Sequence, residues 1–154
     1  MRKIEVAFSD SKLDSVGIFA KTDIKDDLLI SGIENVSFSE LYYLDFELDE
    51  KTIEQIASNV FTDPLVQKYS TGNNLIPDFD FYIEVELHRD VTDNLGIIAH
   101  EGIEDYLGEK INGEIRSAKR FYFKAKISPQ DIERIAKEYL ANEIIETYKV
   151  VKSG

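Results

Sequence analysis

The sequence contains no cysteine and only two histidines among 154 residues. The absence of cysteine excludes disulfides, thiolate nucleophiles and thiolate metal sites. No apolar run reaches the roughly 18 residues that are needed to span a bilayer. The N-terminal residues lead directly into a strand pattern, without the apolar core of a signal peptide. We therefore expect a cytoplasmic protein that does not associate with membranes.

Positive charge is also scarce, since 18 lysines and arginines stand against 30 acidic residues and give a formal net charge of −12. An acidic chain repels phosphate backbones, which argues against a nucleic-acid partner. The apolar fraction of 43% is too high and too regularly patterned for a disordered chain. This length corresponds to one average domain or two small ones.

The chain resembles itself when it is shifted by 79 residues. The two halves align without a gap from Ile4/Ile83 to Tyr69/Tyr148, with about 16 identical positions. This pattern predicts a tandem duplication, with one repeat in residues 1–70, a linker in 71–79 and a second repeat in 80–154. The linker is rich in residues that favour turns.

Each repeat shows the same order of expected elements. Alternating apolar residues predict a strand at 4–8 and again at 83–87. A helix follows each strand, with Asp14 and Asp93 in N-cap positions. Gly17 and Gly96 lie on the apolar face of these helices, where a small residue lets the helix approach a sheet closely.

The remaining pattern predicts two middle strands, a second amphipathic helix and a short last strand in each repeat. The middle strands are expected near Val36/Ile115 and across 42–48 and 121–127, the second helix over 53–61 and 132–140, and the last strand at 65–66 and 144–145. The order β-α-β-β-α-β, twice, is typical of an α+β protein built from two ferredoxin-like repeats with antiparallel sheets.

Such a repeat covers one face of its sheet with helices and leaves the other face open. We expect the two repeats to form an internal pseudo-dimer, either by burying these open faces against each other or by pairing strand edges. Tyr43 and Tyr122 point to the open face and suit an interface between repeats or between chains, because tyrosine buries area and keeps a polar tip. Alternatively, both tyrosines lie on a solvent-facing sheet.

The sequence offers little catalytic machinery. None of the eight glycines falls in a phosphate-binding pattern, and neither His88 nor His100 recurs in the first repeat. We therefore predict no catalytic residue, cofactor or metal. The basic residues Arg116, Lys119 and Arg120 stand out between the two middle strands of the second repeat. They form either a solvated hairpin or a docking patch for an acidic partner.

Two motifs carry a resemblance to a known family. The segment opening the first helix reads Leu13-Asp14-Ser15-Val16-Gly17-Ile18-Phe19-Ala20, and again Thr92-Asp93-Asn94-Leu95-Gly96-Ile97-Ile98-Ala99. The second helix ends in Tyr139-Leu140-Ala141-Asn142-Glu143-Ile144-Ile145-Glu146-Thr147-Tyr148-Lys149-Val150, and Phe61–Tyr69 is a weaker copy. In both motifs the chain resembles the PurS subunit of phosphoribosylformylglycinamidine synthase, as a tandem duplicate of that domain.

The chain departs from the family in its duplication, in the second motif, which lacks the family's proline in the second repeat and its asparagine in the first, and in one turn. Family members carry a basic turn before their third strand, which here corresponds to Ile115–Lys119, whereas Val36–Glu40 in the first repeat lacks the positive charges. If that turn docks a partner, only the second repeat can do so in the usual way.

The resemblance implies a non-catalytic role in purine biosynthesis. A PurS-like protein holds a glutaminase (PurQ-type) subunit and an ATP-dependent synthetase (PurL-type) subunit together, so that ammonia passes between them. It also implies a homodimer of this chain, which would be a particle of four repeats.

Two other functions stay open at this point. A regulatory module of the ACT-like kind would bind a small effector at the repeat interface, although the turns at Ser9–Lys12 and His88–Val91 lack the expected glycines. A standalone enzyme would use acidic residues at the same interface, and turnover by the isolated chain would favour it.

Overall fold

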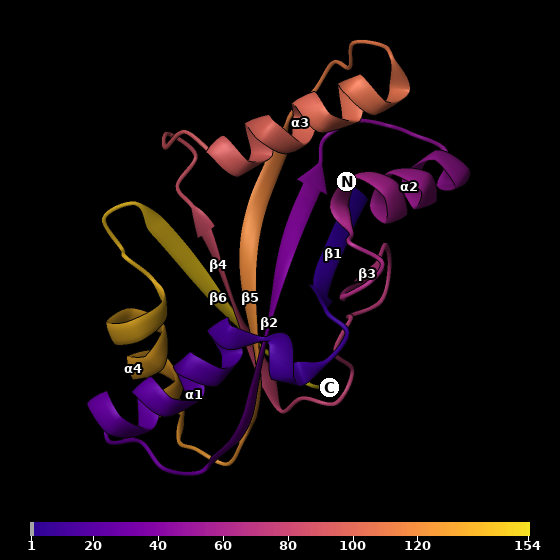
Figure 1. Ribbon diagram of the computed structural model, residues 1–154. Coiled ribbons are helices and arrows are strands. Elements are labelled where there is room, and N and C mark those ends of the chain that lie inside the picture. Colours follow the sequence, from indigo (N-terminus) through magenta and orange to yellow (C-terminus); the bar gives the residue numbers. More distant parts are fainter. Residues whose placement is uncertain (1) are drawn as a thin grey trace.

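The computed structural model describes residues 2–154. Within this range six strands form one antiparallel sheet in the order β3-β1-β2-β5-β4-β6, with the helices on one face (Figure 1). The predicted α+β class with antiparallel strands is therefore confirmed. No helix in residues 2–154 has the length and apolar character that crossing a membrane requires.

The helices and strands alternate within each part of the chain, and β3 is followed directly by β4. They are β1 (Arg2–Phe8), α1 (Ser15–Asp27), β2 (Ile33–Leu44), α2 (Glu50–Ile56), β3 (Gln67–Ser70), β4 (Phe81–Leu87), α3 (Asn94–Leu107), β5 (Ile115–Ala125), α4 (Pro129–Arg134) and β6 (Glu146–Lys152). A 3₁₀ turn at Ser11–Leu13 precedes α1, and π-helical turns at Ala57–Phe61 and Ile135–Leu140 extend α2 and α4.

The two halves of the chain join edge to edge through β2 and β5. Glu40 on β2 lies opposite Lys119 on β5, and these positions are 79 residues apart. Strand β4 begins and ends 79 residues after β1, and α3 begins 79 residues after α1. We call residues 2–70 the first half and residues 80–154 the second half.

The middle of each half differs from the sequence-based prediction. Two strands separated by a turn were expected, but β2 and β5 are single continuous strands of 12 and 11 residues. The prediction was wrong because the polar run around Ser39 was interpreted as a turn. In the structure Ser39 is fully buried on the helix-free face of the sheet, so its polarity does not mark a break in the strand.

The helices pack in pairs that combine the two halves. Ala20 and Ile24 of α1 share a buried cluster with Ile132 and Ile135 of the α4 region. A second cluster joins α3 of the second half to α2 of the first half. Figure 1 shows the α1–α4 pair at one end of the sheet and the α3–α2 pair at the other. Neither half therefore completes a hydrophobic core from its own helices.

An aspartate fixes the start of each long helix. The Asp93 carboxylate accepts hydrogen bonds from the Gly96 backbone N–H (2.9 Å) and from the Ser117 N–H on β5 (2.6 Å). Asp14 makes the corresponding two bonds in the first half. One side chain thus caps the helix and ties it to the neighbouring strand.

The helices lie so close to the sheet that their first turns require glycine. A Cβ on Gly96 would lie 2.1 Å from the carbonyl oxygen of Ile115, and one on Gly17 would lie 2.5 Å from that of Val36. Both obstacles are backbone atoms, so a larger residue would push the helix away from the strand.

The last strands begin later than the sequence pattern predicted. The apolar pairs Leu65-Val66 and Ile144-Ile145 belong to tight turns, and β3 and β6 start just after them. In the second turn Asn142 Oδ1 accepts a hydrogen bond from the Ile144 N–H (3.2 Å). Leu65 and Ile144 are 90% and 86% exposed, so the apolar character of these turns does not reflect burial in the sheet.

Candidate functional site

The helix-free face of the sheet carries a buried polar network. Segment 71–79 crosses this face: Leu75 donates its N–H to Glu5 (3.1 Å), and the Phe79 ring packs 5.2 Å from that of Tyr122. Glu5 is completely buried and Glu84 is 3% exposed. The face that the sequence predicted to be open is therefore partly covered by the chain itself.

Two tyrosine–glutamate pairs cross between the halves in this network. Tyr122 of the second half donates its hydroxyl to Glu5 of the first (2.5 Å), and Tyr43 of the first half donates to Glu84 of the second (2.6 Å). The two tyrosines are 79 residues apart, as are the two glutamates. Tyr43 and Tyr122, which the sequence singled out for an interface, thus both bond across the β2–β5 junction.

Arg120 lies at the centre of the same network. Its guanidinium makes a two-pronged contact with Glu84 Oε1 (2.9 and 2.7 Å) and lies 3.6 Å from Glu5. It also stacks 4.0 Å from the Tyr82 ring centre. With an exposed fraction of 3%, this side chain compensates buried carboxylates, and a partner protein cannot reach it.

The network shifts the acidity of its members. Burial and the hydrogen bond to Glu5 raise the pKa of Tyr122, and burial with the bond to Glu84 raises that of Tyr43. Burial acts to lower the pKa of Arg120, but Tyr122 and the two glutamates outweigh it, so the net pKa is raised. At neutral pH both tyrosines are therefore neutral and act as hydrogen-bond donors.

The three basic residues predicted as a docking patch do not form one. They lie on a continuous strand, so Arg116 and Arg120 face one side of the sheet and Lys119 faces the other. Arg116 donates to the carbonyls of Leu87 (3.1 Å) and His88 (3.2 Å) and so anchors the loop before α3. Only Lys119, with half of its side chain exposed beside Glu146, is accessible to a partner.

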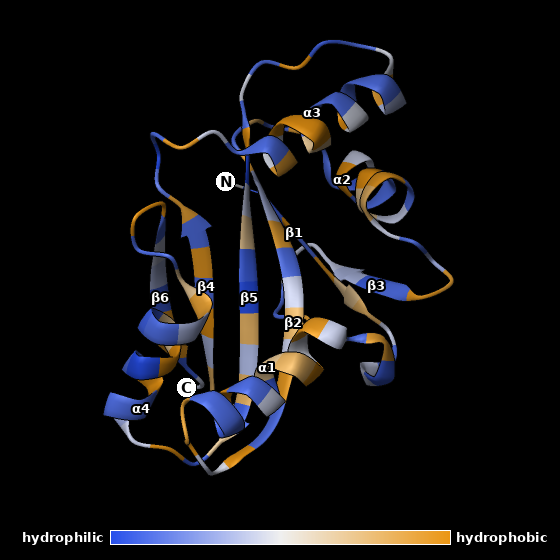
Figure 2. Ribbon diagram, turned by 60° about the vertical axis from the view of Figure 1, so that its left-hand side comes forward, coloured by the Kyte–Doolittle hydropathy of each residue, from blue (hydrophilic) through white to orange (hydrophobic). Residues whose placement is uncertain are grey.

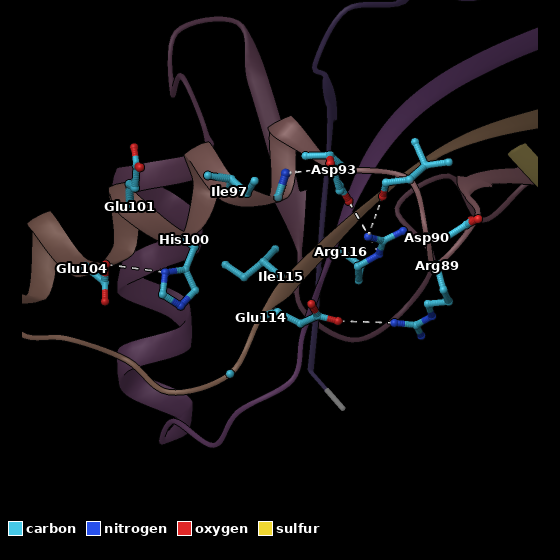
Figure 3. A pocket seen from close by; sticks show the side chains of 14 residues that line it. Arg89, Asp90, Asp93, Ile97, His100, Glu101, Glu104, Glu114, Ile115 and Arg116 are labelled. Atoms are coloured by element: carbon cyan, nitrogen blue, oxygen red, sulfur yellow. Dashed lines mark hydrogen bonds and ion pairs between the residues drawn. The ribbon is translucent and has the colours of Figure 1, made fainter. Parts of the chain in front are cut away.

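A cavity of about 560 Å³ lies between α3 and the start of β5. Its lining combines Ile97 and Ile115 with carboxylates, and Figure 3 shows His100 directed toward Glu104. The His100 Nδ1 lies 3.6 Å from Glu104, and Arg89 pairs with Glu114 at 3.5 Å. We call this the α3 cavity; its excess of carboxylates favours a cationic group.

The first half has a cavity of about 540 Å³ in the corresponding place, between α1 and the start of β2. Ile18 takes the position of Ile97, and Lys21 and Lys25 take the positions of His100 and Glu104. We call it the α1 cavity. The two halves thus present cavities of similar size but different charge.

Both long helices also expose apolar side chains at the same positions. The exposed fractions are 42% and 53% for Val16 and Leu95, 48% and 49% for Ile18 and Ile97, and 63% and 64% for Phe19 and Ile98. In Figure 2 the ribbon carries hydrophobic colouring in the N-terminal half of α1 and of α3. Exposed apolar patches of this kind mark interaction surfaces.

The part of the chain that the structure describes contains no group of three or more His, Asp or Glu side chains placed to hold a metal ion. His88 Nε2 lies 3.0 Å from the carbonyl of Glu143, which links the loop before α3 to the turn before β6. Asp23 accepts a hydrogen bond from the Tyr139 hydroxyl (2.7 Å). These polar groups therefore serve contacts between elements.

Sequence reasoning missed the two glutamates at the centre of the network. Their signal was present, because Glu5 and Glu84 occupy the same place in the identical triplets Ile4-Glu5-Val6 and Ile83-Glu84-Val85. A strand that shows one polar face is normally interpreted as half-exposed. Here the linker and long tyrosine and arginine side chains cover that polar face. The alternation of apolar and polar residues along the strand does not indicate that the polar face is buried.

No family model matches the chain, and no curated protein matches it.

Proposed function

We propose that the chain is a tandem duplicate of a PurS-like, ferredoxin-like domain, folded as an internal pseudo-dimer. The 79-residue spacing between corresponding elements supports the duplication. In the β2–β5 ladder the equivalent residues Glu40 and Lys119 lie opposite each other, which supports a two-fold relation between the repeats. The linker 71–79 then connects two repeats whose helices pack with those of the other repeat.

We further propose that the protein is a non-catalytic bridging subunit of phosphoribosylformylglycinamidine synthase. In this role it holds the glutaminase and ATP-dependent synthetase subunits in register, so that ammonia passes between them. The contribution is positioning: two reactive centres held together react as if at high local concentration. The motifs at the start of the first helix and the end of the second, present in both halves, support this assignment.

The observation that carries the proposal is the matched exposure of Ile18 and Ile97, together with Phe19 and Ile98, at corresponding places on α1 and α3. A bridge needs two surfaces on one rigid body. These residues provide two, and the sheet joins them through the continuous strands β2 and β5. Apolar surface that is removed from water on docking supplies the affinity.

The test is synthase activity of the other two subunits with and without this chain, measured with glutamine and with ammonium as nitrogen donor. We expect the chain to restore glutamine-dependent activity and to leave ammonium-dependent activity nearly unchanged. No response of either activity, together with no co-elution of the three proteins, would exclude the bridging role.

One observation favours a second candidate, an ACT-like module that binds a small effector. A cavity of about 290 Å³ lies at the junction of the halves, lined by Phe38 and Tyr42 from the first half and by Val85 and Lys119 from the second. Calorimetric titration of the chain with amino acids and nucleotides tests this candidate. Binding that Phe38→Ala and Lys119→Ala both weaken would favour it over the bridge.

A further inference from the structure

The α1 and α3 cavities share their position and their apolar residue but differ in charge. Around Ile18 stand three lysines, Lys12, Lys21 and Lys25, with one aspartate, Asp26. The lining around Ile97 contains five carboxylates and two arginines. These are Asp90, Asp93, Glu101, Glu104 and Glu114, with Arg89 and Arg116.

The three lysines that line the α1 cavity are free to meet a partner. Within residues 2–154, no carboxylate lies within 4.0 Å of the Nζ atoms of Lys12, Lys21 or Lys25. These unpaired lysines stand together although acidic residues outnumber basic ones by 30 to 18 in the chain.

In the α3 cavity the cations are already engaged. Arg116 is directed to the loop carbonyls and Arg89 to Glu114. Asp90 and Glu101 remain exposed, with no basic group of the described chain within 4.0 Å of either carboxylate. The free charge at this surface is therefore negative.

We propose that the two surfaces dock two chemically different protein partners. The α1 surface (Lys12, Ile18, Lys21 and Lys25) takes an apolar patch edged by carboxylates, and the α3 surface (Asp90, Ile97 and Glu101) takes an apolar patch edged by lysine or arginine. The shared isoleucine supplies apolar contact on both sides. The opposite charges select the partner, because like charges at an interface are repelled.

This inference rests on the proposed bridging function and specifies it. A bridge with two identical surfaces would bind two copies of one subunit as readily as one copy of each. Opposite charges on the two corresponding surfaces remove that ambiguity, since each subunit is accepted on one side and rejected on the other. The two helices lie at opposite ends of the sheet (Figure 1), which leaves room for both subunits at once.

The experiment uses the full chain with two double variants, Lys21→Glu/Lys25→Glu and Asp90→Lys/Glu101→Lys. All four side chains are exposed, so urea unfolding should verify an unchanged fold. The matched controls are Lys51→Glu/Lys152→Glu and Glu47→Lys/Glu109→Lys, which change the net charge equally at exposed positions outside both cavities. Affinity for the isolated glutaminase and for the isolated synthetase is measured at low and high salt.

We expect each cavity variant to weaken binding of one subunit by about tenfold or more at low salt and to leave the other within about twofold. The two variants should affect different subunits, and the controls should affect neither. Two results would overturn the inference: both variants weakening the same subunit, or neither weakening any.

A further outcome concerns the chain itself, because its two surfaces are complementary to each other. If the wild-type chain self-associates, both cavity variants abolish this, and subunit binding does not change, the surfaces join copies of the chain and the inference is wrong. Failure of the proposed function looks different, because the wild-type chain then binds neither subunit at any salt concentration.

Discussion

Tyr122 on β5 donates its hydroxyl to Glu5 on β1 over 2.5 Å, and 117 positions of the sequence separate the two residues. Both side chains are almost fully buried, with exposed fractions of 1% and 0%. The bond spans β2, which lies between their strands, and so links the two halves from the helix-free side. The helix clusters link the halves from the opposite side, and together they hold the junction from both faces.

Replacing Tyr122 with phenylalanine should therefore destabilise the protein. The change removes a donor from a buried carboxylate, and hydrogen bonds to charged groups contribute about 1.5 to 3 kcal/mol. We expect the free energy of unfolding to fall by about 2 kcal/mol in urea titrations. Tyr43→Phe is the matched control, because the Tyr43–Glu84 bond is only partly buried and Glu84 keeps its two contacts with Arg120; a loss below about 1 kcal/mol is expected there. A larger cost for Tyr43→Phe would contradict this account of the network.

Substitution of Arg120 should have a still larger effect. Arg120→Met leaves Glu5 buried without its cation and leaves Glu84 with only the exposed Lys149 at 3.8 Å. Breaking a buried ion pair in this way costs about 3 to 5 kcal/mol. We expect unfolding at much lower urea or a failure to fold at 37 °C. The neighbouring Lys119→Met should cost less than about 1 kcal/mol, since that side chain is half exposed. Similar effects of the two variants would argue against their placement on opposite faces of one strand.

The contrast between Lys119, which is half exposed, and Arg120, which is buried, shows which features the sequence can predict. The first strands and the helix starts at Asp14 and Asp93 follow from local alternation and capping, which act within a few residues. The burial of Arg120 depends on Glu84 and on Asn74 of the linker, which are 36 and 46 residues away. The polar residues of a central strand such as β5 are covered by segments that are distant in the sequence. A local sequence pattern therefore cannot indicate which segments cover them.

The cavities illustrate the same limit. Lys21 and His100 occupy equivalent positions, but the sequence gives no sign that each lines a cavity beside an exposed isoleucine. Whether such a residue lines a cavity depends on where the start of β2 or β5 lies relative to the helix, and only the assembled sheet fixes that position.

Gly96 should not tolerate alanine. The added Cβ would lie 2.1 Å from the Ile115 carbonyl oxygen, so α3 would have to move away from β5. We expect Gly96→Ala to lower the free energy of unfolding by about 2 to 3 kcal/mol, despite the better helix propensity of alanine. Gly102→Ala in the same helix is the control: its Cβ would meet only the Val60 side chain at 3.3 Å, and propensity favours it by up to about 1 kcal/mol. Equal losses at both sites would show that the close approach is not the cause.

Stability should fall in alkaline solution. Burial and the bond to Asp23 raise the pKa of Tyr139 to about 12, and burial and the bond to Glu133 raise that of Tyr148 to about 12. Tyrosine in the unfolded chain titrates near 10, so above this pH the folded state binds more protons than the unfolded state. Their stabilising contribution is complete below pH 10 and is lost as the pH rises toward 12. The urea midpoint of unfolding, measured between pH 8 and 11.5, tests this prediction. The double variant Tyr139→Phe/Tyr148→Phe should show a smaller decrease of the midpoint with pH than the wild-type chain. An identical decrease would exclude these two tyrosines as its source.

Separating the halves should abolish independent folding. Residues 1–79 contain α1 without α4, and residues 80–154 contain α3 without α2, so each piece exposes half of both helix clusters. Each piece also leaves a central strand, β2 or β5, with an unpaired edge that invites aggregation. We expect each piece alone to lack cooperative unfolding and to be poorly soluble, and the two pieces expressed together to reassociate into a particle of the original mass.

Circular dichroism during urea titration measures the cooperativity of unfolding, and size-exclusion chromatography measures the mass of the particle. Two soluble, cooperatively unfolding monomers would show instead that each half completes its own core, and the exchange of helix partners would then contribute little to stability.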